Sequence, residues 1–122
     1  MSDSSSFQLY LYGPGKGPID STFEDAQHRL EQLPHLHFEP DGSFAWAVQP
    51  GSQEVFGMIY DSASKIQYCE LRGTCGLHAW QQLCFAITGR NSVELEILQI
   101  PDGHLHDLQT FEQLHWPPRK NQ

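Results

Sequence analysis

Seven histidines give this 122-residue chain its largest supply of metal-ligating side chains. Four of them form His-x-His pairs, His35 with His37 and His104 with His106. Alternate residues of a strand project from the same side, so each pair could offer two imidazole nitrogens to one metal ion. Packing the two pairs together would bring four nitrogens to one site. The alternative is that the intervening leucines face the core and the histidines face solvent. We favour this alternative and predict no metal and no other cofactor.

Cys75 and His78 are the candidates for a catalytic pair. The spacing Cys-Gly-Leu-His at the start of a predicted helix would place a thiol near a helix N-terminus, which lowers a thiol pKa. The imidazole would then act as its base, and the backbone amides of Gly76 and Leu77 would stabilise an oxyanion. This spacing is frequent by chance and no catalytic signature surrounds it. A small enzyme is therefore the second interpretation of this sequence, not the first.

Two further patterns do not favour catalysis. The Gly/Pro loop at 13–18 lies between a predicted strand and a predicted helix, where phosphate-binding loops occur. However, Pro14 and Pro18 each remove a backbone donor, and the Lys-Ser/Thr pair of a Walker loop is missing. Glu94 and Glu96 share one side of a predicted strand, but nothing in the sequence separates their pKa values as an acid–base couple requires.

Hydrophobic periodicity predicts the elements that position these residues. Bulky apolar residues alternate along the chain, as at Phe44, Trp46 and Val48, which is typical of strands that bury one side. Strands are predicted at 7–12, 35–39, 43–49, 54–60, 65–72 and 93–98. Apolar stripes with helical spacing predict helices at 21–33, 77–88 and 107–114. Their boundary signals are a Ser21/Glu24 capping box, Gly89 after the second helix and Asp107 before the third.

The predicted order β-α-β-β-β-β-α-β-α indicates an α+β fold. Short turns between consecutive strands favour a mostly antiparallel sheet of about six strands, with the helices packed on one face. The length fits one globular domain spanning residues 1–122, and we expect frayed ends at about 1–6 and 117–122.

Charge and cysteine content narrow the possible partners. The formal net charge is −8, so nucleic acid, which proteins bind through lysines and arginines, is not an expected partner. Three cysteines are an odd number at irregular spacing, which favours reduced thiols over a disulfide framework. No segment has the length and hydrophobicity of a signal peptide or a membrane helix. We therefore predict a cytoplasmic protein with no membrane partner.

The most unusual feature is the second face of the predicted sheet. Solvated strand positions are usually polar, yet several of those predicted here are aromatic or apolar. A face of this composition is typical of a protein-binding surface, and the sequence therefore predicts an interaction module that binds a protein partner or a second copy of itself. The residues expected to form this surface are Tyr10, Tyr12, Phe56, Met58 and Tyr60.

Overall fold

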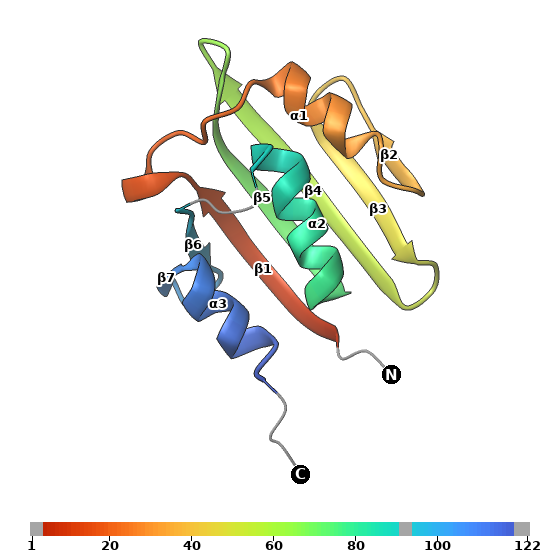
Figure 1. Ribbon diagram of the computed structural model, residues 1–122, viewed down its shortest axis with the longest axis vertical. Coiled ribbons are helices and arrows are strands. Elements are labelled where there is room, and N and C mark those ends of the chain that lie inside the picture. The colour runs from red at the N-terminus through yellow and green to blue at the C-terminus, as the bar shows by residue number, and fades with distance from the viewer. Residues whose placement is uncertain (1–3, 91–93, 119–122) are drawn as a thin grey trace.

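Figure 1 shows the computed structural model, in which three helices lie against one face of a single sheet. The structure describes residues 4–90 and 94–118. The strands are β1 (Ser4–Tyr12), β2 (Leu36–Phe38), β3 (Ser43–Gln49), β4 (Gln53–Ser62), β5 (Lys65–Gly76), β6 (Glu96–Gln99) and β7 (Leu105–Asp107). The helices are α1 (Phe23–Leu30), α2 (Leu77–Thr88) and α3 (Leu108–His115), and a 3-10 turn, η1, spans Pro14–Lys16.

The sheet is antiparallel between every pair of neighbouring strands, in the order β2-β3-β4-β5-β1-β6-β7. This confirms the predicted fold class, with seven strands where six were expected. The additional strand is β7, a three-residue edge strand that continues directly into α3. It is too short to show a period-2 pattern, so the sequence offered no signal for it.

The core lies between the sheet and the three helices. Alternate residues of β1 point toward the helices, and Leu9 and Leu11 are fully buried there. Trp80 and Ile87 of α2 and Phe111 of α3 are fully buried as well, because each lies on the stripe of its helix that faces the sheet. One face of the sheet is thereby covered, and the polar and aromatic residues between the buried positions point away from all three helices.

α2 and α3 match the predicted helices to within one residue, but α1 is shorter than the predicted 21–33, because Gln32 and Leu33 continue the chain in turns with amide bonds to the third residue before them. The Thr22 hydroxyl, not that of Ser21, caps α1, because it accepts a hydrogen bond from the Asp25 amide. α2 spans the predicted residues and ends at Gly89, whose φ of 77° is the left-handed conformation that glycine adopts without strain. Asp107 caps α3, as predicted, by accepting a hydrogen bond from the Thr110 amide at 2.7 Å.

The N-terminal end of the described chain is more ordered than predicted. Residues 4–6 were expected to be frayed, but they form the start of β1, paired in register with residues 74–76 of β5. Residues 1–3 and 119–122 lie outside the described residues, as does Val93, the predicted start of the sixth strand.

Candidate functional site

The five residues predicted to bind a partner lie on the face of the sheet that carries no helix among the described residues, here called the open face. Tyr10 and Tyr12 come from β1, and Phe56, Met58 and Tyr60 come from β4. Phe56 and Tyr60 each expose 37% of their surface, and the other three are half-buried by their neighbours. The structure therefore brings all five together on one solvent-accessible surface.

Tyr68 of β5 joins this group, although the sequence analysis did not select it. A β-bulge at Gln67 sets Asp61 opposite Ile66 but Tyr60 opposite Tyr68. Strict alternation from the buried Ile66 would have placed Tyr68 inside the core. The bulge turns the Tyr68 ring to the open face instead, and its cross-strand partner Tyr60 is the signal that could have revealed it.

All four tyrosines of the chain form one cluster around Tyr68. The ring of Tyr68 stacks on that of Tyr60 with centroids 4.6 Å apart, and meets those of Tyr10 and Tyr12 at 5.6 Å. Desolvation raises the pKa of Tyr12 and of Tyr60 above the ordinary value, and the Glu70 carboxylate adds to the effect at Tyr60. Both phenols are therefore neutral at physiological pH, and that of Tyr60 donates a hydrogen bond to Glu70.

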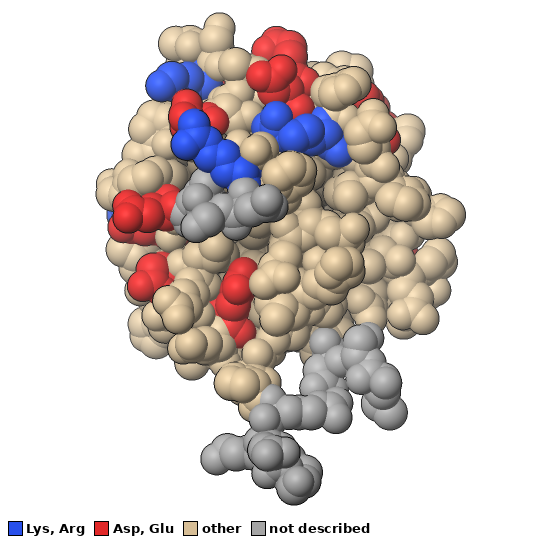
Figure 2. Space-filling model, in the orientation of Figure 1, with Lys and Arg blue, Asp and Glu red and all other residues tan. Residues whose placement is uncertain are grey.

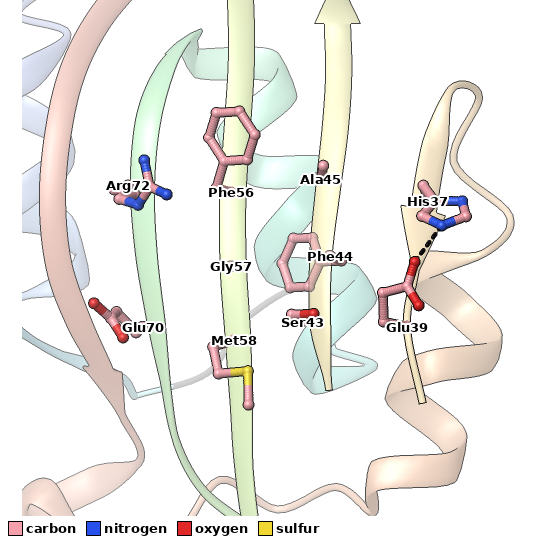
Figure 3. A pocket seen from close by; sticks show the side chains of 10 residues that line it. All are labelled: His37, Glu39, Ser43, Phe44, Ala45, Phe56, Gly57, Met58, Glu70 and Arg72. Atoms are coloured by element: carbon pink, nitrogen blue, oxygen red, sulfur yellow. Dashed lines mark hydrogen bonds and ion pairs between the residues drawn. The ribbon is translucent and has the colours of Figure 1, made fainter. Parts of the chain in front are cut away.

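Figure 3 shows a shallow hollow of about 510 Å³ on the open face, lined in part by Met58 and by Glu70, which is opposite Tyr10 in the strand register. Its floor is low because β3 presents only small side chains there, Ser43 and Ala45. The larger side chains of Phe56 and Met58 on β4 stand next to this floor. Side chains of different size on neighbouring strands thus create the depression without any gap in the sheet.

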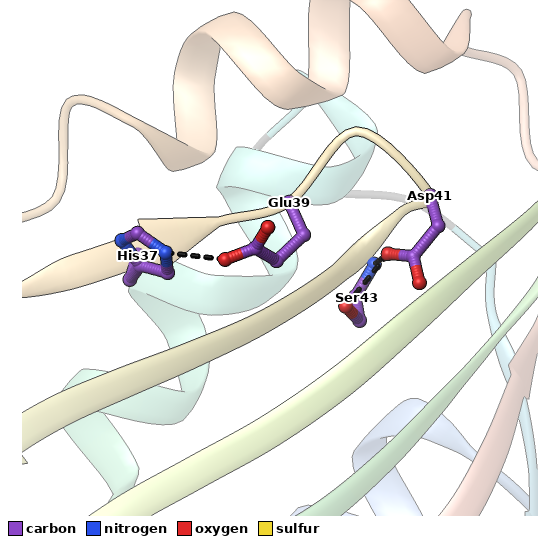
Figure 4. Close-up of polar contacts among 4 residues, drawn as sticks. All are labelled: His37, Glu39, Asp41 and Ser43. Carbon is purple, nitrogen blue, oxygen red and sulfur yellow. Dashed lines mark hydrogen bonds and ion pairs between the residues drawn. The ribbon is translucent and has the colours of Figure 1, made fainter.

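At the β2 edge the hollow is lined by His37 and Glu39, and Figure 4 shows their contact together with that of Asp41 and Ser43 in the neighbouring turn. His37 of β2 forms a hydrogen bond with Glu39, which follows the strand. In the turn between β2 and β3, the carboxylate of Asp41 accepts hydrogen bonds from the amide and hydroxyl of Ser43, which lowers the pKa of Asp41. The pairing of Asp41 with Ser43 is an Asx-type contact that stabilises the turn next to the hollow.

Three carboxylates on the open face form no ion pair within the described residues. Glu54, Glu70 and Glu96 take outward positions on β4, β5 and β6, and within the described residues no cationic nitrogen lies within 4.0 Å of them. Arg72 is two residues from Glu70 on β5, but its guanidinium lies over the Phe56 ring, 4.8 Å from the centroid. The face therefore combines aromatic surface with three carboxylates that form no ion pair in the described part of the chain.

The structure gives Cys75 and His78 different environments. Cys75 is buried at the end of β5, and burial raises the pKa of its thiol to about 12. His78 is exposed on α2, and the rim of a separate surface depression includes it. A thiol that stays protonated in the core is not an activated nucleophile. This geometry therefore gives no support to Cys75 and His78 as a catalytic pair.

The two His-x-His pairs lie at opposite edges of the sheet. His35 and His37 belong to the β2 end, whereas His104 and His106 flank or form part of β7. Five strands separate the two edges, so the structure does not bring together the four imidazole nitrogens that a shared metal site would need. Residues 4–90 and 94–118 contain no group of three or more His, Cys, Asp or Glu side chains arranged to hold a metal ion.

One histidine contact was missed by the sequence analysis because it joins the two ends of the chain. The Ser5 hydroxyl lies 2.8 Å from Nδ1 of His115, and Gln99 Oε1 lies 3.2 Å from Nε2. The Gln99 oxygen selects the Nε2–H tautomer, which leaves Nδ1 to accept from Ser5. Phe111 stacks on the imidazole at 4.2 Å. These contacts connect α3 to β1 and β6, and His115 acts here as a structural residue.

Comparison with known proteins assigns no family and no function to this chain. In the described part of the chain, no helix is both long enough and apolar enough to cross a membrane. No protein-family model matches the chain, and no curated protein or solved structure is significantly similar to it.

Proposed function

We propose that this protein is an interaction module whose open face binds a basic protein partner. The observation that carries the proposal is the exposed aromatic surface formed by the tyrosine cluster together with Phe56 and Met58. Tyrosine is enriched at interface hot spots because it offers a large apolar area and a hydrogen-bonding hydroxyl at low entropic cost. An exposed surface of this kind on a sheet face is characteristic of a binding site.

The charge of the chain favours a basic partner over a second copy. The formal net charge is −8, and the carboxylates of Glu54, Glu70 and Glu96 point outward from the open face. Two copies packed through this face would bring like charges together, which is unfavourable in a partly desolvated interface. On the helix side, in contrast, Lys and Arg lie among Asp and Glu (Figure 2), and Arg90 pairs with Asp20 at 2.7 Å.

Site-specific photo-crosslinking tests the proposal. p-Benzoylphenylalanine in place of Phe56 would capture a partner on the open face in a lysate of the source cells. The same group in place of Phe85 on α2, which is 43% exposed on the helix side, is the matched control. We expect an adduct specific to the Phe56 position, formed with a segment rich in lysine and arginine.

The captured protein must then bind the unlabelled module in purified form. We expect Tyr60→Ala or Phe56→Ala to weaken this binding at least about tenfold, the effect typical of a hot-spot residue, and Phe85→Ala to leave it unchanged. Equal binding by all variants would overturn the proposal. If the only adduct formed is with a second copy of this chain, the open face mediates self-association and the proposal of a basic partner is wrong.

A further inference from the structure

Glu70 is the best-placed carboxylate on the open face for binding a cation. It is half-buried on β5, directly opposite Tyr10 of β1 and Met58 of β4 in the strand register. The hydroxyl of Tyr60 lies 3.4 Å from its carboxylate oxygen. Since no cationic nitrogen of the described residues lies within 4.0 Å, Glu70 bears a partly desolvated charge that lacks a counter-ion.

Aromatic rings around Glu70 would contribute to binding the same cation. Two cations of the chain already lie over rings at either end of the aromatic surface: Arg72 over Phe56 at 4.8 Å and Lys16 over Tyr12 at 6.0 Å. The rings between them, those of Tyr10, Tyr60 and Tyr68, have no cation over them in the described part of the chain. The middle of the surface thus combines a carboxylate that lacks a counter-ion with rings that have no cation over them, although Tyr60 and Tyr68 stack on each other.

We propose that the end of the hollow lined by Glu70 and Met58, together with the neighbouring rings of Tyr10 and Tyr60 (here called the recess), binds an arginine side chain of the partner. The inference rests on the proposed docking function of the open face. A planar guanidinium can pair with a carboxylate through two parallel hydrogen bonds while it stacks on an aromatic ring. Met58 provides apolar surface for the aliphatic stem, and the adjoining hollow leaves space for the backbone that carries it. A lysine ammonium would use the charge but not the planar stacking.

Small single-cation probes test this inference without knowledge of the partner. Acetyl-arginine amide is titrated into the ¹⁵N-labelled protein. Acetyl-lysine amide serves as a probe of the same charge, and acetyl-citrulline amide as an uncharged probe of similar shape. We expect the arginine probe to shift resonances of residues around Glu70 and Tyr60 and to bind about two- to fivefold more tightly than the lysine probe. The citrulline probe should leave these resonances unchanged.

Two variants with the same change in net charge separate the recess from general electrostatics. Glu70→Gln should weaken binding of the arginine probe about fivefold or more. Glu24→Gln, on the exposed side of α1, should leave the affinity for this probe unchanged. Equal effects of the two variants, equal binding of arginine and lysine, or shifts spread over the whole surface would each overturn the proposal.

The result of the probe titration can be distinguished from the result of the photo-crosslinking experiment. If crosslinking from the Phe56 position still captures the partner in a Glu70→Gln background at undiminished affinity, the open face is a docking site but the arginine recess is not part of it. If the probe binds at Glu70 while no partner is captured, the recess binds guanidinium groups but the proposed function fails.

Discussion

His115 illustrates how one side chain can couple stability to pH. Its imidazole lies between Ser5 and Gln99 and stacks on the Phe111 ring. Desolvation lowers the pKa of His115 below the ordinary value, and the nearby His106 lowers it further. The unfolded chain therefore binds a proton at this residue before the folded protein does.

This difference predicts a pH-dependent contribution to stability. The contribution of neutral His115 is complete above the ordinary histidine pKa of about 6.5 and is lost as pH falls through the lower folded-state value. Urea unfolding at pH 7.5, 6.5 and 5.5 should show wild type losing stability relative to His115→Gln as the pH falls. The exposed His28 on α1 provides the control, because His28→Gln should keep the wild-type pH profile. Parallel profiles for all three proteins would contradict the prediction.

The cysteines offer a second test at the residue scale. All three thiols are buried, and burial raises the pKa of Cys75 to about 12 and that of Cys69 further. We expect a neutral-pH thiol probe to modify none of them in the folded protein, since both the thiolate and access are lacking. All three should react in urea. Rapid modification of Cys75 in the folded protein would instead revive the catalytic interpretation.

At the scale of elements, the close approach of β3 and β4 depends on a glycine. The Phe44 ring packs over Gly57, its cross-strand partner, and a β-carbon at Gly57 would lie 2.3 Å from a ring atom. The ring itself is buried, so a movement away from an added methyl group would disturb the core around it.

Gly57→Ala should therefore destabilise the protein by about 1–3 kcal/mol through overpacking. Thermal or urea unfolding measures this loss. A double-mutant cycle provides the control, because Phe44→Leu removes the clashing ring atoms and should make the added methyl group at Gly57 much less harmful. Additive losses would show that the ring is not the cause.

Arg29 connects two helices. Its guanidinium donates to the carbonyls of Ala86 and Ile87 in the last turn of α2, at 2.8 and 3.3 Å, and to the Ser21 hydroxyl before α1 at 2.7 Å. The last carbonyls of a helix have no partner within the helix and carry the negative end of its dipole, so a cation is favourable there.

Arg29→Met should cost about 1–3 kcal/mol, because it keeps the aliphatic stem but leaves these carbonyls without their charged donor. The comparison variant is Arg90→Met, which breaks only the exposed ion pair with Asp20 and should cost at most about 1 kcal/mol. Chemical unfolding of the two variants would reveal the difference. Equal losses would show that the contacts to α2 contribute little.

For the whole molecule, charge and histidine content predict the solubility profile. The seven histidines are neutral in the formal charge of −8, and protonating all of them would bring that charge to −1. We expect solubility to fall steeply between about pH 6 and 5, where ordinary histidines gain protons and mutual repulsion weakens. Turbidity measured against pH tests this, and a flat profile would contradict it.

The sequence by itself determined the class of fold and most of the elements. Period-2 patterns located β3 and the central strands, and α2 was predicted with its observed boundaries because an apolar stripe ends at a glycine suited to the left-handed conformation. It also indicated that apolar residues at outward positions, such as Tyr10 and Met58, exceed what helices on one face can cover. These features are local in sequence, and local patterns report them directly.

Only the tertiary structure decided which of those residues meet. The bulge at Gln67 turns Tyr68 outward, and the strand order places Glu70 between Tyr10 and Met58. The same order sets the two histidine pairs at opposite edges, and the packing of α3 brings His115 to Ser5. Such contacts join residues far apart in the chain, and strand order and register, which depend on the packing of the whole sheet, determine them.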